Sequence, residues 1–504
     1  MVVSQTKIKT IVIVGGGTSG WMTAAALSHQ FKDKSVQVRL IESSDMGTIG
    51  VGEATIPTIR RFYKKLGLSD LDVLMKTNAT CKLGIEFKGW QGEGSSFIHP
   101  FGLFGQEVNH VPFHHYFNKV RLSGNTTPFA DFSLGVNLAK QNKFSQPPTQ
   151  PKNQLEIFDW ALHFDAGLFG QLMRDYSTAN GVKLTDSKIY QVDLNEQDGS
   201  IATLHLENGE TVSGDLFIDC SGFGGYLIEK SLKTGYEDWS HYLVCDTAVA
   251  VQSELVGEPI ARTVAHAQKA GWQWQIPLQN RMGNGIVFSS QFIDKDEAIA
   301  AMLSNIKGKT TQEVRSFKFT PGRRKKAWNK NCIAVGLASG FLEPLESTSI
   351  ALVETAIEKI VEFVADETIT QDKADKFNYA MAQEYERVRD FIILHYKLNG
   401  RTDSPMWQHC RDLAVPDTLA NKMAAYKKDG TLMRLPWEIF GNDSWLAIYD
   451  GLGYMPESYD PSVDKFEVGF LNDRLAEMKH FIKTTVDSAQ THADYLRQHC
   501  GFEQ

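Results

Sequence analysis

A buried strand, a glycine-rich turn and a helix open the chain, and this combination most narrows the folds it can adopt. Residues 11–14 form an unbroken β-branched run, typical of a strand inside a parallel sheet. Gly15, Gly17 and Gly20 follow at GxGxxG spacing, and residues 21–30 have the apolar periodicity of a helix. Glycine at these positions permits a tight turn, a close approach of pyrophosphate and close helix packing. The pattern therefore predicts a dinucleotide site.

An acidic residue after the next strand completes this pattern. Residues 37–41 read as a strand, and Glu42 follows them, 22 positions after Gly20, where a carboxylate can meet a ribose hydroxyl. Thr18 and Ser19 lie inside the glycine-rich turn and are also expected to contact the dinucleotide. The alternative, a glycine-rich turn that binds nothing, is disfavoured by the strand and helix on either side of it.

Two further segments favour FAD over NAD. The loop 50–57 resembles the flavin-contacting loop of FAD monooxygenase-like proteins, and it contributes four candidate cofactor contacts: Gly50, Gly52, Glu53 and Ala54. The segment 215–223, a strand ending in Asp219 before Ser-Gly, looks like the strand that closes an FAD fold over the adenine half. A second GxGxxG is not evident, so either a separate NAD(P)H-dependent flavin reductase or a transient visit of NAD(P)H is expected to reduce the FAD.

The segment 340–349 combines carboxylates with a polar helix start. Glu343 and Glu346 flank Pro344, which prevents a regular helical pair, and a Ser-Thr-Ser run then precedes a helical pattern. The unpaired N–H groups at such a helix start suit an anion. The alternative is an ordinary helix N-cap with charged neighbours.

A lysine and an aromatic pair complete the set of unusual features. Lys82 lies in an apolar stretch, where it either extends its amine to solvent or is a buried nucleophile with a lowered pKa. Trp272, Trp274 and Ile276 alternate along a predicted strand that ends at Pro277, so they share one face. By themselves they could be an aromatic ladder on an edge strand.

Taken together, the GxGxxG and W-x-W-x-I-P strings resemble the flavin-dependent halogenases, the group that includes the tryptophan halogenases, over nearly the whole chain. The resemblance implies an α/β fold with a Rossmann-like FAD-binding module (GR2/PHBH-type, monooxygenase-like) and a mainly helical substrate module. Residues 1–90 and 150–380 are expected to form the discontinuous FAD- and halide-binding module. Residues 91–149 and 381–504 are expected to form the mostly helical substrate-binding module.

The resemblance also implies roles for individual residues. Lys82 and Glu346 fall at the places of the family's essential lysine and glutamate, whereas Glu343 is expected to be structural. The resemblance places halide contacts at Thr348 and Ser349, and FAD contacts at Gly336 and Leu345. It places substrate contacts at Ser347, Phe440 and His99-Pro100-Phe101, whose His and Phe sandwich the ring. A wall between flavin and substrate is implied at Trp272, Trp274, Ile276 and Pro277.

The implied chemistry is an electrophilic halogenation. Reduced FAD, O₂ and chloride or bromide give hypohalous acid, which Lys82 either hydrogen-bonds or captures as a haloamine. An electron-rich ring attacks the halogen, and Glu346 stabilises or deprotonates the cation that forms. The alternatives are an aromatic hydroxylase or monooxygenase on the same fold and a non-catalytic FAD-binding protein. The tryptophan wall, Lys82 and Glu346 argue against both.

The segment 435–445 departs from the family members that act on free tryptophan. Their Tyr- and Glu-containing grip is shortened or missing here, and Phe440 falls about where they have a stacking tryptophan. A small indole, or a larger indole- or phenol-type compound, is therefore the expected substrate. Ser349 stands where tryptophan halogenases usually have glycine, and a bromide preference is the expectation drawn from it.

Composition sets the remaining expectations. A net charge of -8 gives no attraction to nucleic acid or anionic membrane, and no apolar run is long enough to cross a bilayer. Six widely spaced cysteines and the absence of a signal-peptide pattern favour a cytoplasmic protein. Neither cysteines nor carboxylates accompany His110, His114 and His115 at ligand spacing, so no metal is expected. Residues 103–153 read as loop-rich, and the apolar stripe along 470–486 is a packing face or a homodimer interface.

Overall fold

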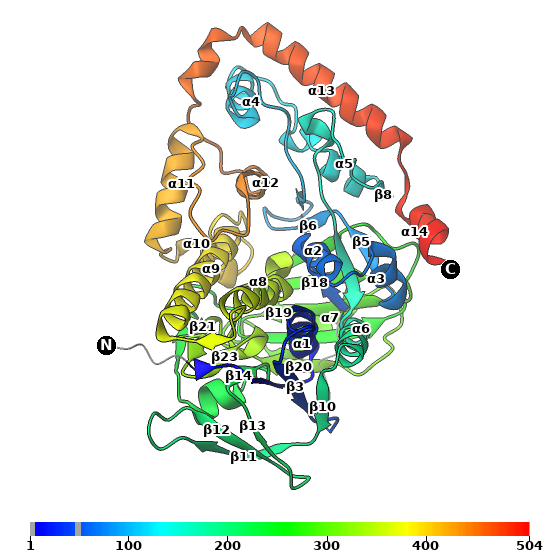
Figure 1. Ribbon diagram of the computed structural model, residues 1–504. Helices are drawn as coiled ribbons and strands as arrows, with labels where there is room; N and C mark the ends of the chain where they lie inside the picture. The colour runs from blue at the N-terminus through cyan, green and yellow to red at the C-terminus, as the bar shows by residue number, and fades with distance from the viewer. Residues whose placement is uncertain (1–5, 46–51, 503–504) are drawn as a thin grey trace.

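The computed structural model describes residues 6–45 and 52–502 (Figure 1), with sheets in the lower part of the view and a mostly helical part above them. The first sheet has the order β10-β3-β2-β14-β23-β22, of which the first five strands are parallel. Its strands are Lys183–Asp186, Gln37–Glu42, Thr10–Val14, Leu216–Asp219, Cys332–Ala334 and Trp328–Asn329. The predicted parallel strands at 11–14 and 37–41 are present.

Three helices pack around the beginning of this sheet. The helix α1 (Thr18–Gln30) follows the glycine-rich turn and lies against α6 (Ala166–Ala179) and α8 (Thr348–Phe363). The buried side of α1 is formed by small and apolar residues such as Met22, Ala25 and Leu27. Because α8 begins in the segment 340–349, this packing brings that segment to the carboxyl ends of the parallel strands, where α/β sheets bind their ligands.

A second, mainly antiparallel sheet has the order β20-β16-β19-β18-β17-β6-β7, and only β17 and β6 are parallel neighbours. Its strands are Arg315–Lys318, Thr247–Ser253, Met282–Phe288, Gly271–Pro277, Thr263–Gln268, Gly84–Lys88 and Ser96–Pro100. The predicted W-x-W-x-I-P strand is β18, which lies inside the sheet rather than at its edge. A small sheet, β4-β9-β5 (Gly52–Ala54, Ala161–Asp165, Thr80–Lys82), lies beside it.

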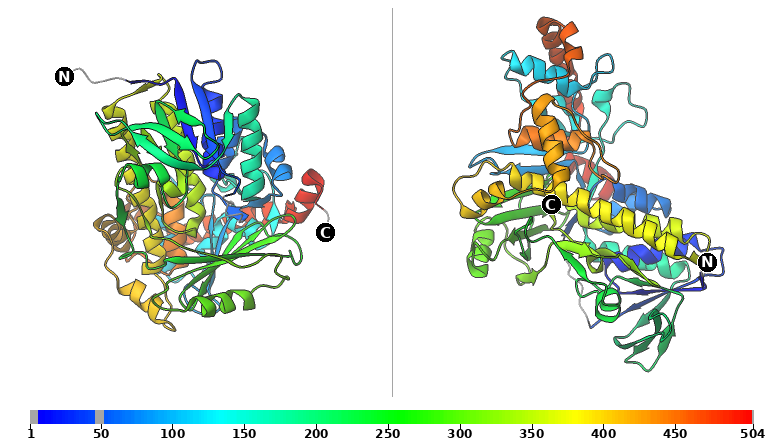
Figure 2. Two further views of the ribbon diagram at one scale, coloured as in Figure 1. Left: turned by 90° about the horizontal axis from the view of Figure 1, so that it is seen from below. Right: turned by 90° about the vertical axis from the view of Figure 1, so that its left-hand side faces the viewer.

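The mostly helical part combines two regions that are distant in the sequence (Figures 1 and 2). The helix α13 (Val468–Ser488) packs on α4 (Phe113–Leu122) and α5 (Leu134–Lys140), with Leu471, Leu475 and Ile482 among its buried residues. The shorter helices here are α10 (Pro405–Asp412), α11 (Asp417–Asp429), α12 (Asn442–Gly451) and α14 (His492–Cys500).

The stretch expected to be loop-rich, 103–153, also contains short helices, which are held by buried phenylalanines at Phe113, Phe117, Phe129 and Phe132. The module boundary expected at residue 380 falls inside α9, one continuous helix from Gln371 to Lys397. That helix runs from the sheets to the helical part and therefore connects the two expected modules. Within the described residues, no helix is long and apolar enough to span a bilayer.

Candidate active site

A cavity of about 940 Å³ lies between the parallel sheet and β18. Its volume is near the top of the range of about 300–1,000 Å³ typical of ligand pockets. Of the predicted site residues, the following line it: Gly15, Gly17, Thr18, Ser19, Glu42, Glu53, Ala54, Trp272, Trp274, Ile276, Gly336, Leu345, Glu346, Ser347, Thr348 and Ser349. The glycine-rich turn and the segment 345–349 therefore face the same space.

The glycine-rich turn has no room for side chains on its inner surface. A Cβ on Gly15 would lie 2.3 Å from the Cys220 carbonyl oxygen, and one on Gly20 would lie 1.9 Å from the Gly15 carbonyl oxygen. A Cβ on Gly17, in contrast, would meet nothing within 4 Å. The turn is thus tight on the protein side and open on the cavity side, at the N-terminus of α1. This cradle and the long cavity fit a dinucleotide such as FAD.

Two of the three acidic residues predicted to bind FAD, Glu42 and Asp219, have different surroundings. Glu42 lines the cavity, and its carboxylate accepts hydrogen bonds from Trp21 Nε1 at 3.2 Å and Arg174 at 3.0 Å. Asp219 is fully buried, and its Oδ2 accepts the backbone N–H groups of Leu227 and Ile228, each at 2.8 Å. These hydrogen bonds fix the conformation of the turn after β14. The cavity itself is lined by the residues that follow Asp219, from Cys220 to Gly224.

The loop 50–57 is described only in part, because Gly50 lies outside the described residues. Gly52 and Ala54 belong to β4, which pairs with β9. Glu53 faces the cavity, and burial raises the pKa of its carboxyl to about 7.

The tryptophan strand forms one wall of the cavity. The indole rings of Trp272 and Trp274 lie 6.1 Å apart, and both rings are buried. Gly285 on the neighbouring strand makes this possible, since a Cβ there would lie 1.9 Å from the Trp274 ring. Trp272 Nε1 donates to Glu343 at 3.2 Å, and Tyr396 also donates to that carboxyl group, at 2.9 Å. Burial raises the pKa of Glu343 to about 8, so it is neutral at pH 7.

The segment between β24 (Gly340–Phe341) and α8 is held in an unusual backbone conformation. Glu346 and Ser347 have φ values of 66° and 58°, in the left-handed region that non-glycine residues rarely adopt. This reversal sends the Glu346 side chain away from the helix, whereas Thr348 and Ser349 begin α8 at the cavity wall. No side chain caps the first turn of α8, so its N–H groups are free of side-chain acceptors there.

Lys82, on β5, is completely buried beside this segment. Its Nζ donates to the Thr55 carbonyl oxygen and to Ser347 Oγ, each at 2.8 Å. The amine lies 5.2 Å from the centre of the Phe101 ring. Burial lowers the pKa of Lys82 to about 7, against a smaller opposing effect of the Glu346 carboxylate. Two hydrogen bonds leave one position on the nitrogen open, a third N–H in the ammonium or a lone pair in the amine.

Glu346 is held between two histidines. Its Oε2 lies 2.7 Å from His99 Nδ1 and its Oε1 lies 2.8 Å from His395 Nε2, with all three side chains buried. Burial opposes the ionisation of Glu346, but the two histidines outweigh burial and lower its pKa to about 2. Glu346 is therefore the anionic centre of this group.

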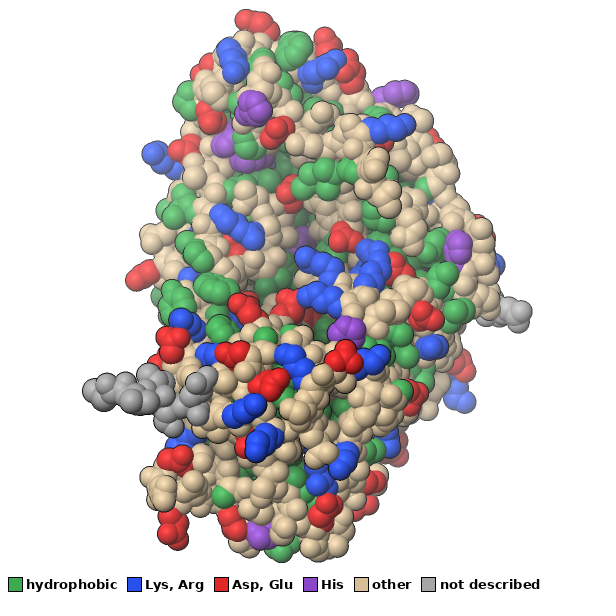
Figure 3. Space-filling model, in the orientation of Figure 1, with side chains coloured by type: hydrophobic (Ala, Val, Ile, Leu, Met, Phe, Trp, Pro, Cys, Tyr) green, Lys and Arg blue, Asp and Glu red, His purple; other side chains and the backbone are tan. Residues whose placement is uncertain are grey.

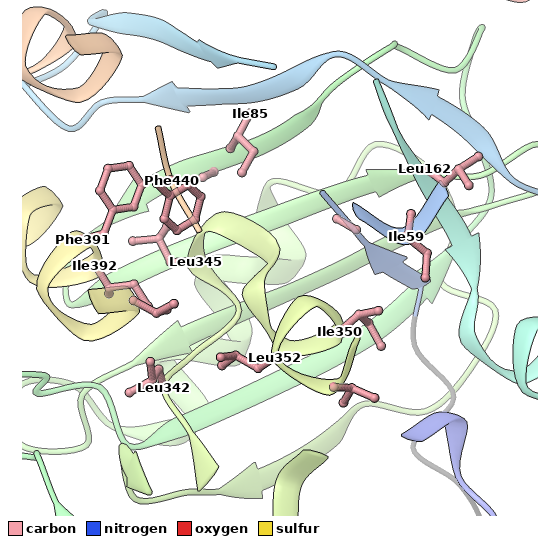
Figure 4. Packing of buried hydrophobic residues seen from close by; sticks show 14 of the residues in the cluster. Ile59, Ile85, Leu162, Leu342, Leu345, Ile350, Leu352, Phe391, Ile392 and Phe440 are labelled. Carbon is pink, nitrogen blue, oxygen red and sulfur yellow. The ribbon is translucent and has the colours of Figure 1, made fainter. Parts of the chain in front are cut away.

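Aromatic rings enclose His99. Its ring centre lies 6.5 Å from Phe101, 5.8 Å from Phe391 and 6.0 Å from Phe440, and each ring is tilted by at least 55°. Phe391 and Phe440 are stacked 4.1 Å apart next to Leu345 (Figure 4). His99 and Phe101 are thus not parallel walls for a flat ring, as the sandwich expectation requires. Pro100, predicted with them, is buried at the end of β7.

One of the two acidic residues in the segment 435–445, Glu438, is already paired with a cation. The Glu438 side chain is 3% exposed, and its Oε1 lies 2.5 Å from Lys422 Nζ. Lys422 also lies 4.1 Å from the centre of the Trp445 ring, which faces the Phe391 ring at 5.1 Å. A hollow opens on this side of the molecule, between the helical part and the sheets (Figure 3).

The sequence did not indicate His395, Phe391 or Thr55 as site residues. His395 lies one helical turn after Phe391 in α9, at the i, i+4 spacing that places two side chains on the same helix face. That spacing next to an aromatic residue was the available signal, but it is common in ordinary cores. Thr55 contributes only its backbone carbonyl, which leaves no side-chain signature.

Comparisons with known proteins agree with this geometry. The family model described as tryptophan halogenase matches residues 10–467. A tryptophan 6-halogenase (ThaL) of Streptomyces albogriseolus is 33% identical over 532 aligned residues, covering 98% of each chain. The structure of BrvH, a flavin-dependent halogenase from Brevundimonas sp. BAL3, matches at 50% identity with a TM-score of 0.95, covering 98% of this chain and 99% of its own. That of Xcc4156, a flavin-dependent halogenase from Xanthomonas campestris, matches at 37% identity with a TM-score of 0.94, with the same coverage.

Proposed function

Because the chain belongs to the tryptophan halogenase family, we propose that it is an FADH₂-dependent halogenase of uncharged, indole-type aromatic compounds. FAD, when bound in the long cavity and reduced, would supply the electrons that activate O₂, and the activated oxygen would oxidise the halide. The protein's own residues bind the halide, hold the oxidant and orient the aromatic ring.

The segment 345–349 carries this proposal, because its side chains face two sides. Thr348 and Ser349 line the cavity at the uncapped start of α8, which suits a chloride or bromide ion. Glu346 faces the histidines and the aromatic rings, and Ser347 holds Lys82. A small oxidant formed near the helix start reaches Lys82 along this segment, whereas the indole walls of β18 separate a substrate ring from the flavin side.

Lys82 is suited to hold a halogen oxidant. With a pKa of about 7, its amine exists in both protonation states near neutral pH. In either state one position is open, since Thr55 and Ser347 take only two hydrogen bonds. The ammonium can donate to hypohalous acid and the amine can accept the halogen, and both routes place the electrophile beside Phe101. Glu346 stabilises the positive charge that develops on the ring.

The surroundings of Glu438 support a substrate without an ammonium group. The relative from Streptomyces albogriseolus is named a tryptophan 6-halogenase, and free tryptophan carries both a carboxylate and an ammonium. Here the Glu438 carboxylate is buried against Lys422, so binding an ammonium there would first break an ion pair. The rings around His99 present apolar faces, which suit indole itself or a larger neutral indole.

Two partners belong to this proposal. A separate NAD(P)H-dependent flavin reductase supplies the reduced FAD, and the halide is chloride or bromide. Ser349, with its hydroxyl at the helix start, is the residue through which the halide preference would be set.

An aromatic hydroxylase is the competing function, because such an enzyme uses the same flavin and O₂. The buried Lys82 and the indole wall favour halogenation, since hydroxylation requires neither an amine nor a barrier between flavin and ring.

Mass spectrometry of the product tests the proposal. The protein is incubated with FAD, a flavin reductase, NADH, O₂, indole and an equal mixture of chloride and bromide, and free tryptophan is tested in parallel. We expect products with the isotope patterns of chlorine or bromine, and more product from indole than from tryptophan. A product heavier than indole by one oxygen atom would contradict the halogenase proposal, and a preference for tryptophan would contradict the substrate class.

A further inference from the structure

His99 contains a buried nitrogen for which the packed protein provides no partner. Its side chain is 1% exposed, and Nδ1 is hydrogen-bonded to Glu346 at 2.7 Å. Nε2, on the other side of the ring, has no hydrogen-bond partner among the described residues. Leaving a buried polar atom unpaired costs about 1–3 kcal/mol. Several other buried side-chain atoms share this state, and His99 Nε2 is the one whose ring is also hydrogen-bonded to Glu346.

The protonation of the three side chains follows from their hydrogen-bond partners. His395 Nδ1 faces the Phe391 carbonyl oxygen at 2.7 Å and its Nε2 faces Glu346 at 2.8 Å. Both partners are acceptors, so each His395 nitrogen is placed to donate a hydrogen bond. His99 needs only one proton, on Nδ1, to donate to Glu346. Its Nε2 then carries a free lone pair.

This arrangement matches a carboxylate–imidazole couple that acts as a base. A carboxylate on one ring nitrogen fixes the tautomer and stabilises the imidazolium that forms when the other nitrogen takes a proton. Glu346 itself is a weak base, because each of its oxygens already accepts an N–H. The Nε2 lone pair of His99 is therefore the free proton acceptor of this group.

We propose that His99, through Nε2, is the catalytic base that removes the proton from the halogenated ring, with Glu346 orienting it and stabilising its charge. The inference rests on the proposed halogenase function and changes the role of His99 from a stacking surface to a base. The residue that positions Glu346 from the other side is His395.

The step balances as follows. Two π electrons of the ring form the carbon–halogen bond, the oxygen–halogen bond of hypohalous acid breaks, and hydroxide leaves with that electron pair. The Lys82 ammonium protonates the hydroxide to water. His99 Nε2 then takes the proton from the carbon that carries the halogen, and the C–H electron pair restores the aromatic ring. The imidazolium proton restores the Lys82 ammonium, so the sum is ArH + HOX → ArX + H₂O.

The variant His99→Phe tests the proposal, since it keeps an aromatic ring and removes the nitrogen. Product formation is followed in a single turnover with indole and, separately, with indole deuterated at every carbon. We expect the rate to fall about 10²-fold and a primary isotope effect of at least about twofold to appear, because proton removal becomes slow. Indole affinity should stay within about threefold of the wild type.

Phe101→Leu is the matched control, because it disturbs the same cluster and leaves Nε2 in place. It should change indole affinity without an isotope effect. His99→Phe with at least half of the wild-type rate, or with weakened indole binding and no isotope effect, would overturn the proposal. If His99→Phe does not fold, His99→Asn serves, since its amide can donate to Glu346 but is not basic.

Nitrogen NMR of histidine-labelled protein gives an independent readout that needs no turnover. The His99 signal is assigned by its loss in His99→Asn, and we expect a proton on Nδ1 and none on Nε2 at pH 7. A protonated Nε2 would overturn the inference whatever the protein halogenates. Failure of the wild-type protein to halogenate indole would instead contradict the proposed function.

Discussion

At the scale of single residues, the site depends on burying ionisable groups that are only partly compensated. Lys82 has no carboxylate in hydrogen-bond contact and is fully buried. The pKa of Lys82 is about 7, compared with an ordinary 10.5, because the folded protein stabilises the ammonium form less than water does. A reactive amine is thus obtained at the expense of stability.

The stability of Lys82→Met should reveal this effect. Between pH 7 and 10.5 the unfolded lysine holds a proton that the folded one has lost, so wild-type stability rises with pH. Methionine has no such penalty, so we expect it to raise the Tm most at pH 6 to 7 and progressively less towards pH 10. Scanning calorimetry measures the difference. The exposed Lys65→Met is the control, and a Tm difference that is independent of pH would contradict the lowered pKa.

The role of a residue was predictable where the residue stands in a distinctive motif. Lys82, Glu346 and the tryptophans stand in distinctive strings, and the structure brings Lys82 next to Ser347 across more than 250 positions of sequence. His395 was missed because the partner that makes it unusual, Glu346, is 49 residues away. The hydrogen bonds of the Asp219 carboxylate were equally unpredictable, because most of its partners are backbone N–H groups.

At the scale of elements, the segment before α8 is tied to β18 and α9 through Glu343. Trp272 donates from the strand and Tyr396 from the helix to the same carboxyl group. Burial keeps this group protonated at neutral pH, with a pKa of about 8. The connection fixes the indole wall relative to the catalytic segment.

Glu343→Gln should stabilise the protein in a pH-dependent way. Between pH 4.5 and about 8 the Glu343 carboxyl is protonated in the folded protein but ionised in the unfolded chain. Wild-type stability therefore falls as the pH rises through this range. The fall approaches about 1.4 kcal/mol per pH unit. Glutamine keeps the shape without the charge, so its Tm advantage should grow from pH 5 to pH 8 and then level off. An advantage that shrinks over this range would contradict a neutral Glu343.

The strand that carries Lys82 is held from its other edge by the C-terminal helix. His492 Nε2 accepts the Cys81 N–H at 3.1 Å, and its Nδ1 donates to the Pro259 carbonyl oxygen at 2.9 Å. Burial lowers the pKa of His492 to about 4, which keeps Nε2 an acceptor at neutral pH. The position of β5 therefore depends on α14, far from the cavity.

His492→Ala should impair halogenation while leaving FAD binding intact. A small displacement of β5 moves Lys82, and misplacement by about 1 Å can cost up to about 10²-fold in rate. Halogenated product is measured against FAD affinity, with the exposed His480→Ala as control. Product formation equal to that of the control would show that α14 does not position the lysine.

Elements were predictable in proportion to their periodicity. The strands at 11–14 and 37–41 and the helix after the glycine turn match the structure, because local pattern and burial agree there. The short helices between residues 113 and 140 lie in a stretch expected to be loop-rich, and they were not predicted individually. Their phenylalanines are grouped by contacts among α4, α5 and α13 rather than by one clear period. The continuity of α9 across residue 380 also lacked a local signal.

At the scale of the whole molecule, two chemistries are expected on opposite sides of the segment 345–349. The parallel sheet and β18 enclose the cavity that fits FAD, and the strands and helices around His99 enclose the aromatic cluster. The fold class followed from the glycine turn and the family resemblance. The division of the segment into a flavin side at Thr348 and Ser349 and a substrate side at Glu346 also followed from the resemblance. The left-handed backbone at Glu346 and Ser347 had no signal in the sequence.

The most direct test is to uncouple flavin reoxidation from halogen transfer to the aromatic ring. Lys82→Met is assayed with FAD, a flavin reductase, NADH, O₂, bromide and indole, and both halogenated indole and released hydrogen peroxide are quantified against the wild type. We expect halogenated product to fall by at least about 10²-fold, with flavin reoxidation unchanged and peroxide release continuing. Halogenation within twofold of the wild type, or loss of flavin reoxidation together with product, would contradict the separation of the two sites by Lys82.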